Sequence, residues 1–251
     1  MHSWLYSNLM NNSTQKEKSG FYQKIRVIDG TVLKLIAMLT MVCDHVGDIF
    51  FPGAPWMRVI GRIAMPIFAF CIAEGYHYTH DRRKYLLRLG VFAVISELPF
   101  DLAFSGGFDW THQNIMLTFF LAVLALILFD YCCGSGENKK ALRFAAGCMP
   151  VVAICIAAML LGTDYTLFGI LTVWVFHIAR KLPHPFRALS GVGLMALLRT
   201  KGVYLGTGLA FIPLALYNGK KGKGLKWLFY VFYPGHLLIL FLLHMLLVHP
   251  T

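Results

Sequence analysis

The chain has 251 residues, of which 57% are hydrophobic and 14% charged, and its formal net charge is +11. About a quarter of the residues of a soluble globular domain are charged, so this composition excludes an ordinary soluble protein and predicts an integral membrane protein in contact with the lipid bilayer. The six cysteines have no CxxC or Cys/His spacing, which predicts neither a disulfide framework nor a metal site.

Apolar runs long enough to span a bilayer recur along the chain. They predict an all-α fold, a polytopic integral membrane helix bundle with about nine transmembrane helices. Eight to ten are compatible, because two of the runs are short and glycine-rich. Residues 1–31 are expected to form a cytoplasmic N-terminal segment, and residues 32–248 a single transmembrane domain. The expected spans lie near 32–51, 57–77, 85–104, 114–132, 143–161, 165–180, 186–199, 203–218 and 227–248.

The positive charge is distributed between the spans rather than gathered in one segment. Nineteen of the 23 Lys and Arg residues fall on one side of the predicted spans, and four on the other. The positive-inside rule then predicts a cell (inner or plasma) membrane protein with its N-terminus in the cytoplasm and its C-terminus outside. The basic loops are therefore interpreted as topology signals, and no nucleic-acid partner is expected.

Three consecutive spans each carry two charged residues four positions apart: Asp44 with Asp48, Arg58 with Arg62, and Glu97 with Asp101. That spacing places both members of a pair on one helix face. A charge at the bilayer centre costs about 3 kcal/mol, so these faces are expected to meet one another or to line a wet cavity. The topology puts all six in the outer halves of their spans, level with Gln113 and Asn114. Pairs that only fasten helices together are the alternative.

Two histidines are candidate catalytic bases. His45 follows Asp44, and a partly desolvated histidine beside an aspartate is the usual arrangement for a general base. His236 follows Pro234-Gly235, a pair expected to break or kink the last span. Broken membrane helices usually line cavities, which makes His236 the reserve candidate.

A second polar group lies at the cytoplasmic end of the second span and just beyond it. It forms a candidate funnel for a phosphorylated cytosolic ligand and consists of Glu74, His77, Arg82, Arg83 and Lys84. Solvation of a helix end explains the same residues, so both interpretations stay open.

A family resemblance is carried by Leu33–Gly47, Arg58–Phe70 with Glu74-Gly75, Tyr85–Ala103, Gln113-Asn114 and Phe232–His236. These segments are similar to the corresponding parts of the TraX family, and the resemblance is specific across 33–120 and again near 230–240. The family is named for a membrane protein of conjugative plasmids that N-acetylates the pilin subunit using acetyl-CoA. Many members are encoded away from any pilus system, so the resemblance implies acyl transfer more than it implies a pilin acceptor.

The residues and the resemblance together predict a membrane-embedded acyltransferase that moves acetyl from cytosolic acetyl-CoA to an amine or hydroxyl acceptor. His45 is the expected general base, and Asp44 is expected to orient it. The inner basic residues would hold the phosphates of acyl-CoA. Arg58 and Arg62 would position a carboxylate or stabilise an oxyanion.

The acceptor is expected to meet the remaining outer polar residues. Glu97 and Asp101 would bind it or balance the arginines, and Gln113 and Asn114 complete the expected substrate-binding set. An ion- or proton-coupled transporter is the competing class, because intramembrane carboxylates and histidines are equally characteristic of it. A structural membrane assembly factor is the third class, in which the charges matter only for folding.

Overall fold

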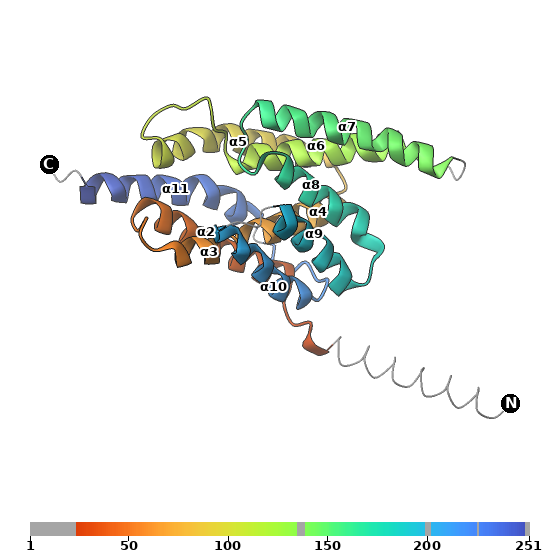
Figure 1. The fold of residues 1–251 in the computed structure, drawn as a ribbon, viewed down its shortest axis with the longest axis horizontal. Coiled ribbons are helices and arrows are strands. Elements are labelled where there is room, and N and C mark those ends of the chain that lie inside the picture. Colours follow the sequence, from red (N-terminus) through yellow and green to blue (C-terminus); the bar gives the residue numbers. More distant parts are fainter. Residues whose placement is uncertain (1–23, 135–138, 199–201, 225, 249–251) are drawn as a thin grey trace.

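The computed structural model describes residues 24–134, 139–198, 202–224 and 226–248, and within these ranges every named element is a helix (Figure 1). The elements are α2 (Gly30–Ile49), α3 (Pro55–Gly61), α4 (Ala64–Tyr78), α5 (Arg82–Phe104), α6 (Ile115–Cys133), α7 (Lys140–Leu160), α8 (Thr166–Ile178), η1 (Ala179–Lys181), α9 (His184–Leu198), η2 (Gly202–Ala210), α10 (Phe211–Ala215) and α11 (Lys226–Val248). The predicted all-α fold is confirmed for this part of the chain. Most of the predicted segment 1–31 lies outside the described residues.

Each predicted span coincides with a helix or a pair of consecutive helices, and two of them are interrupted. The second span divides into α3 and α4 around Arg62. Pro66 has no N–H to donate to the carbonyl of Arg62, so a regular helical hydrogen bond is missing at that point. The eighth span consists of the 3₁₀ segment η2 followed by α10, in a stretch that contains Gly202, Gly206 and Gly208.

Four helical segments among the described residues are long and apolar enough to cross a membrane: Pro55–Tyr78, Ile115–Cys133, Lys140–Leu160 and Trp227–Leu247. These segments indicate a membrane protein. Large apolar side chains point outward along α7 and α11, where Met149 is 71% and Leu246 72% exposed. Extended apolar surfaces of this kind fit contact with lipid better than contact with water.

The core lies around α4, which packs against α2, α6, α8, α9 and η2. Phe70, Ala73 and Tyr76 of α4 are fully buried. The pair α6 and α7 lies on one side of the molecule, and α2 with α3 lies on the other (Figure 1). The centre of the bundle is therefore bounded by helices from both halves of the sequence.

Helices α2 and α11 run side by side in the same direction, although nearly 200 residues separate them in the sequence. Near the start of both, the N–H of Gly30 donates to the carbonyl of Lys220 at 2.8 Å. Near their ends, the rings of Phe50 and His244 are 6.0 Å apart. α11 continues through Pro234 as one helix, so of the expected break or kink in the last span the break is wrong. The site described next lies along this pair of helices.

Candidate functional site

The two arginines of α3 and its C-cap meet the two aspartates of α2, as the spacing of four predicts. Arg58 Nη1 lies 2.5 Å from Asp48 Oδ2, and Arg58 Nε lies 3.5 Å from Asp44 Oδ1. Arg62 Nη2 lies 3.4 Å from Asp44 Oδ2, and its Nη1 donates to the Tyr165 hydroxyl at 2.9 Å. Asp44 and Arg62 are buried, whereas the side chain of Asp48 is 44% exposed. Two cations and two anions make this ion-pair cluster electrically neutral.

Gly61 allows α3 to approach α2 closely enough for these contacts. A Cβ atom at this position would overlap the side chain of Asp44. The helix start at Pro55 and the interruption after Gly61 then place both guanidinium groups toward α2. The local sequence thus determines the geometry of the ion-pair cluster.

His45 meets His236 rather than Asp44. Its Nδ1 lies 2.9 Å from Nε2 of His236, and the two rings stack with centroids 5.1 Å apart. The expectation that Asp44 orients His45 is therefore corrected, because Asp44 faces the arginines and His236 supplies the contact to the imidazole. Neighbouring residues in an α-helix point about 100° apart, which sends the two side chains to different partners.

The hydrogen bonds of this histidine pair determine which nitrogen carries each proton. Nδ1 of His236 lies 2.8 Å from the carbonyl oxygen of Phe232, an acceptor, so Nδ1 of a neutral His236 is the protonated nitrogen. Nε2 of His236 then accepts the Nδ1–H of His45. Nε2 of His45 is left with a free lone pair, which is the form that a general base requires.

Two phenylalanine rings enclose the histidine pair. The Phe104 ring meets His45 edge-on at 5.2 Å, and the Phe232 ring stacks on His236 at 4.7 Å. The rings hold both imidazoles in place and shield them from solvent on these sides. His236 is buried, and His45 is partly exposed.

The remaining predicted outer residues hold the connection between α5 and α6. Asn114 caps α6 by accepting the N–H of Met116 at 2.9 Å, and it donates to the carboxylate of Glu97. Asp101 accepts the N–H of Asp109 at 3.2 Å, and Gln113 donates to the Trp110 carbonyl at 3.1 Å. The prediction that Glu97 and Asp101 balance the arginines is therefore wrong. These side chains instead form hydrogen bonds with the N-cap of α6 and with the loop 105–114.

A cavity of about 500 Å³ runs along α2 inside the bundle. At one end it is lined by Asp44, His45 and Arg62, with Tyr165 beside them. At the other end it is lined by four cations: Lys34, Arg88, Lys221 and Lys223. Lys34 and Asp44 are ten residues apart on α2, which corresponds to about 15 Å along the helix axis. The cavity therefore connects an imidazole and ion-paired end with a basic end.

A second cleft of about 600 Å³ lies at the C-terminal ends of α2, α5 and α11. Asp48, Phe104 and His244 are among its lining residues. Because Phe104 also contacts His45, this ring separates the cleft from the histidine at the end of the main cavity.

Of the residues predicted to form a phosphate funnel, only one lines this cavity. Glu74 lines it and is paired with Arg187 at 2.7 Å, whereas His77, Arg82, Arg83 and Lys84 are not among its lining residues. The cations that line the cavity are instead Lys34, Arg88, Lys221 and Lys223. These four residues carry only a weak signal in the sequence, because basic residues next to spans are first of all topology signals.

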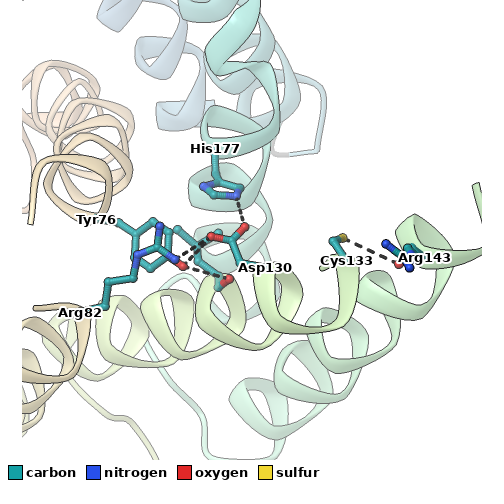
Figure 2. A network of polar contacts seen from close by, with 7 residues as sticks. Tyr76, Arg82, Asp130, Cys133, Arg143 and His177 are labelled. Atoms are coloured by element: carbon teal, nitrogen blue, oxygen red, sulfur yellow. Dashed lines mark hydrogen bonds and ion pairs between the residues drawn. The ribbon is translucent and has the colours of Figure 1, made fainter. Parts of the chain in front are cut away.

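A carboxylate that no sequence pattern predicts, Asp130, joins α4, α5, α6 and α8. Asp130 lies near the end of α6, where its Oδ1 is 2.9 Å from Nε2 of His177. Its Oδ2 accepts from the Tyr76 hydroxyl at 2.7 Å and lies 3.0 Å from Nη1 of Arg82 (Figure 2). His77 stacks on His177 with ring centroids 4.8 Å apart. His77 and Arg82 therefore belong to a group of polar contacts that connects these helices.

These features define an all-helical membrane protein with an internal cavity that has a histidine pair and ion-paired arginines at one end. The chain belongs to the TraX family, because the family model described as TraX protein matches residues 29–244. The matched range includes the ion-pair cluster, the histidine pair and the basic end of the cavity.

Three relatives show how far the likeness extends. The chain is 27% identical over 237 residues to the probable fimbrial assembly protein FimC, serogroup H1, of Dichelobacter nodosus, covering 83% of this chain and 92% of FimC. It is 31% identical over 145 residues to protein TraX of Escherichia coli, covering 57% of this chain and 53% of TraX. Protein TraX of strain K12 is 31% identical over 147 residues, 58% of this chain and 54% of that protein. The chain thus matches about half the length of the TraX proteins. No solved structure matches it.

Proposed function

We propose that this protein is a membrane-embedded acyltransferase that moves an acetyl group from acetyl-CoA to an amine or hydroxyl acceptor. The observation that carries the proposal is the hydrogen-bonded series from the Phe232 carbonyl through His236 to His45. It leaves an unprotonated imidazole nitrogen on His45, a residue that lines the cavity. An acceptor amine or hydroxyl needs such a base at its attack on a thioester.

In this reaction His45 transfers the proton and Arg62 stabilises the negative charge that develops. Acetyl-CoA supplies an activated acyl group and a thiolate leaving group. Nε2 of His45 takes the proton of the acceptor as the new bond to the acyl carbon forms, and it returns that proton to the leaving sulfur as the C–S bond breaks. The Arg62 guanidinium is held by Asp44 and Tyr165, and in this reaction it would stabilise the developing oxyanion in a site of low dielectric. Atoms and charges balance without a further reactant.

The two hollows suggest how the substrates reach the histidine. The basic end of the main cavity suits a phosphate-bearing co-substrate from the cytosol. The second cleft, beyond Phe104, suits an acceptor that arrives from the opposite side. FimC of Dichelobacter nodosus is named for fimbrial assembly, so a fimbrial or pilin-type protein subunit is the first acceptor to test.

Purified protein in detergent tests the proposal with acetyl-CoA and an acceptor peptide, by the release of the CoA thiol and the mass of the acetylated product. His45→Gln cannot take the proton, and we expect transfer to fall about 10²–10⁴-fold while coenzyme A binding is retained. The matched control is His80→Gln, an exposed histidine that lines neither hollow, and it should keep wild-type activity.

Other outcomes identify the other classes. Equal activity in the two variants would remove His45 from the mechanism. Proton flux in proteoliposomes without any thiol release would indicate the ion-coupled transporter. Loss of folded His45→Gln protein would assign the histidine a structural role.

A further inference from the structure

The loop before α11 folds back onto the start of α2 and places two lysines at the cavity. The hydroxyl of Thr31 donates to the carbonyl of Lys223 at 2.9 Å, and the N–H of Gly30 donates to that of Lys220 at 2.8 Å. Gly222 has a φ of +74°, and a Cβ there would lie 2.5 Å from the hydroxyl oxygen of Thr31. The backbone of residues 218–224 is thus fixed by specific contacts, with Lys221 and Lys223 lining the cavity.

Two further cations reach the same end from neighbouring helices. Nζ of Lys34 lies 4.8 Å from the centroid of the Phe229 ring in the first turn of α11. Arg88 belongs to α5, which packs along α11 through the stacked rings of Phe92 and Tyr230, 4.9 Å apart. Lys34, Arg88, Lys221 and Lys223 therefore gather around the start of α11, and together they are called the basic end.

The four cations of the basic end outnumber the carboxylates near them, since Asp29 lies against Gly222 but is engaged in capping α2. Among the described residues, no carboxylate forms an ion pair with any of the four. The nearby cavity carboxylate, Glu74, is already paired with Arg187 and accepts from the Tyr217 hydroxyl at 3.4 Å. The guanidinium group of Arg88 hydrogen-bonds to Tyr230, but its buried Nε has no hydrogen-bond partner in the described part of the chain. A buried guanidinium N–H without an acceptor is costly, which points to a ligand that supplies one.

We propose that the basic end binds the phosphate groups of a ligand, with the half-buried Arg88 and Lys34 as donors inside the cavity and the two exposed loop lysines at the rim. Under the proposed function, on which this assignment of the ligand rests, the phosphates are those of coenzyme A. The cavity then directs the rest of the molecule along α2 toward His45. Anionic lipid headgroups carry the same chemistry and are distinguished by experiment.

The test measures equilibrium binding of coenzyme A to the full chain in uncharged detergent, with inorganic pyrophosphate as competitor. The double variant Lys34→Gln/Arg88→Gln should bind coenzyme A at least about tenfold more weakly for each charge removed. Pyrophosphate should compete in the wild type. The matched control, Arg143→Gln/Lys181→Gln, also removes one arginine and one lysine charge, but from residues that do not line the cavity. It should bind coenzyme A as the wild type does.

A second variant keeps the test valid if the first does not fold. Lys221→Gln/Lys223→Gln changes only exposed loop side chains, and it should also weaken binding. Nanodiscs of phosphatidylcholine with or without phosphatidylglycerol form the lipid arm. Competition by phosphatidylglycerol but not by pyrophosphate would support the phosphate site and assign it to lipid.

The result that overturns the inference is equal affinity of the basic-end variants and the control for coenzyme A, pyrophosphate and phosphatidylglycerol alike. This failure is separable from that of the proposed function. Normal acetyl transfer and normal coenzyme A affinity in the basic-end variants would reject coenzyme A as the ligand of this site and keep the transferase. Charge-dependent pyrophosphate binding without any acetyl transfer would keep the site and reject the transferase.

Discussion

His45 and Asp44 are adjacent in the sequence but belong to different networks in the structure. The sequence identifies both as functional candidates because charged and imidazole groups are rare in apolar spans. It cannot assign their partners, since those come from α3 and α11 and depend on how the helices pack. His236, the reserve candidate for the base, hydrogen-bonds to His45 and so acquires the orienting role expected of Asp44.

The orienting role predicts a difference between two substitutions of His236. His236→Gln can still donate to the Phe232 carbonyl and accept from Nδ1–H of His45, so transfer should stay close to the wild-type rate with the same pH profile. His236→Leu can do neither, and transfer should fall about 10–100-fold, by analogy with residues that orient metal-binding histidines. Steady-state rates across pH, with melting temperature as the folding control, check both. Equal losses in the two variants would mean that His236 itself transfers the proton.

At the scale of elements, the apolar runs predict the helices well and their interruptions poorly. The first span agrees with α2 to within two residues, because its length and apolar pattern determine both ends. The division of the second span arises from Pro66 and from the approach of Gly61 to Asp44, which is a packing requirement. Similarly, Pro234 is accommodated within α11, since surrounding helices determine whether a proline breaks a membrane helix.

The packing of α3 on α2 predicts that Gly61→Ala is destabilising. The added methyl group would overlap Asp44, and such overpacking costs about 1–3 kcal/mol. Gly53→Ala is the matched control, because nothing lies within 4 Å of a Cβ at that position. Thermal unfolding of both variants in the same detergent checks the prediction. A Gly61→Ala protein as stable as Gly53→Ala would show that α3 is free to move away from α2.

At the scale of the molecule, the sequence predicts a polar site inside a helical membrane protein, and the structure relocates the cationic part of it. Arg82 and its neighbours follow an expected span and were the natural candidates for phosphate binding. Arg82 is instead paired with Asp130, and the cavity receives lysines from a loop nearly 200 residues away from Lys34. Long-range contacts of this kind leave no local pattern in a sequence, which is why the basic end could not be predicted.

The proposed reaction is tested most sharply by acetyl transfer across a membrane, with the protein in oriented proteoliposomes. Acetyl-CoA is supplied only on the side of the 218–224 loop and the acceptor peptide only on the opposite side. We expect acetylated peptide on the acceptor side, with coenzyme A released on the other, and about 10²–10⁴-fold less of both with His45→Gln. Product formed only when both substrates share one side, or no product in either arrangement, would contradict this expectation.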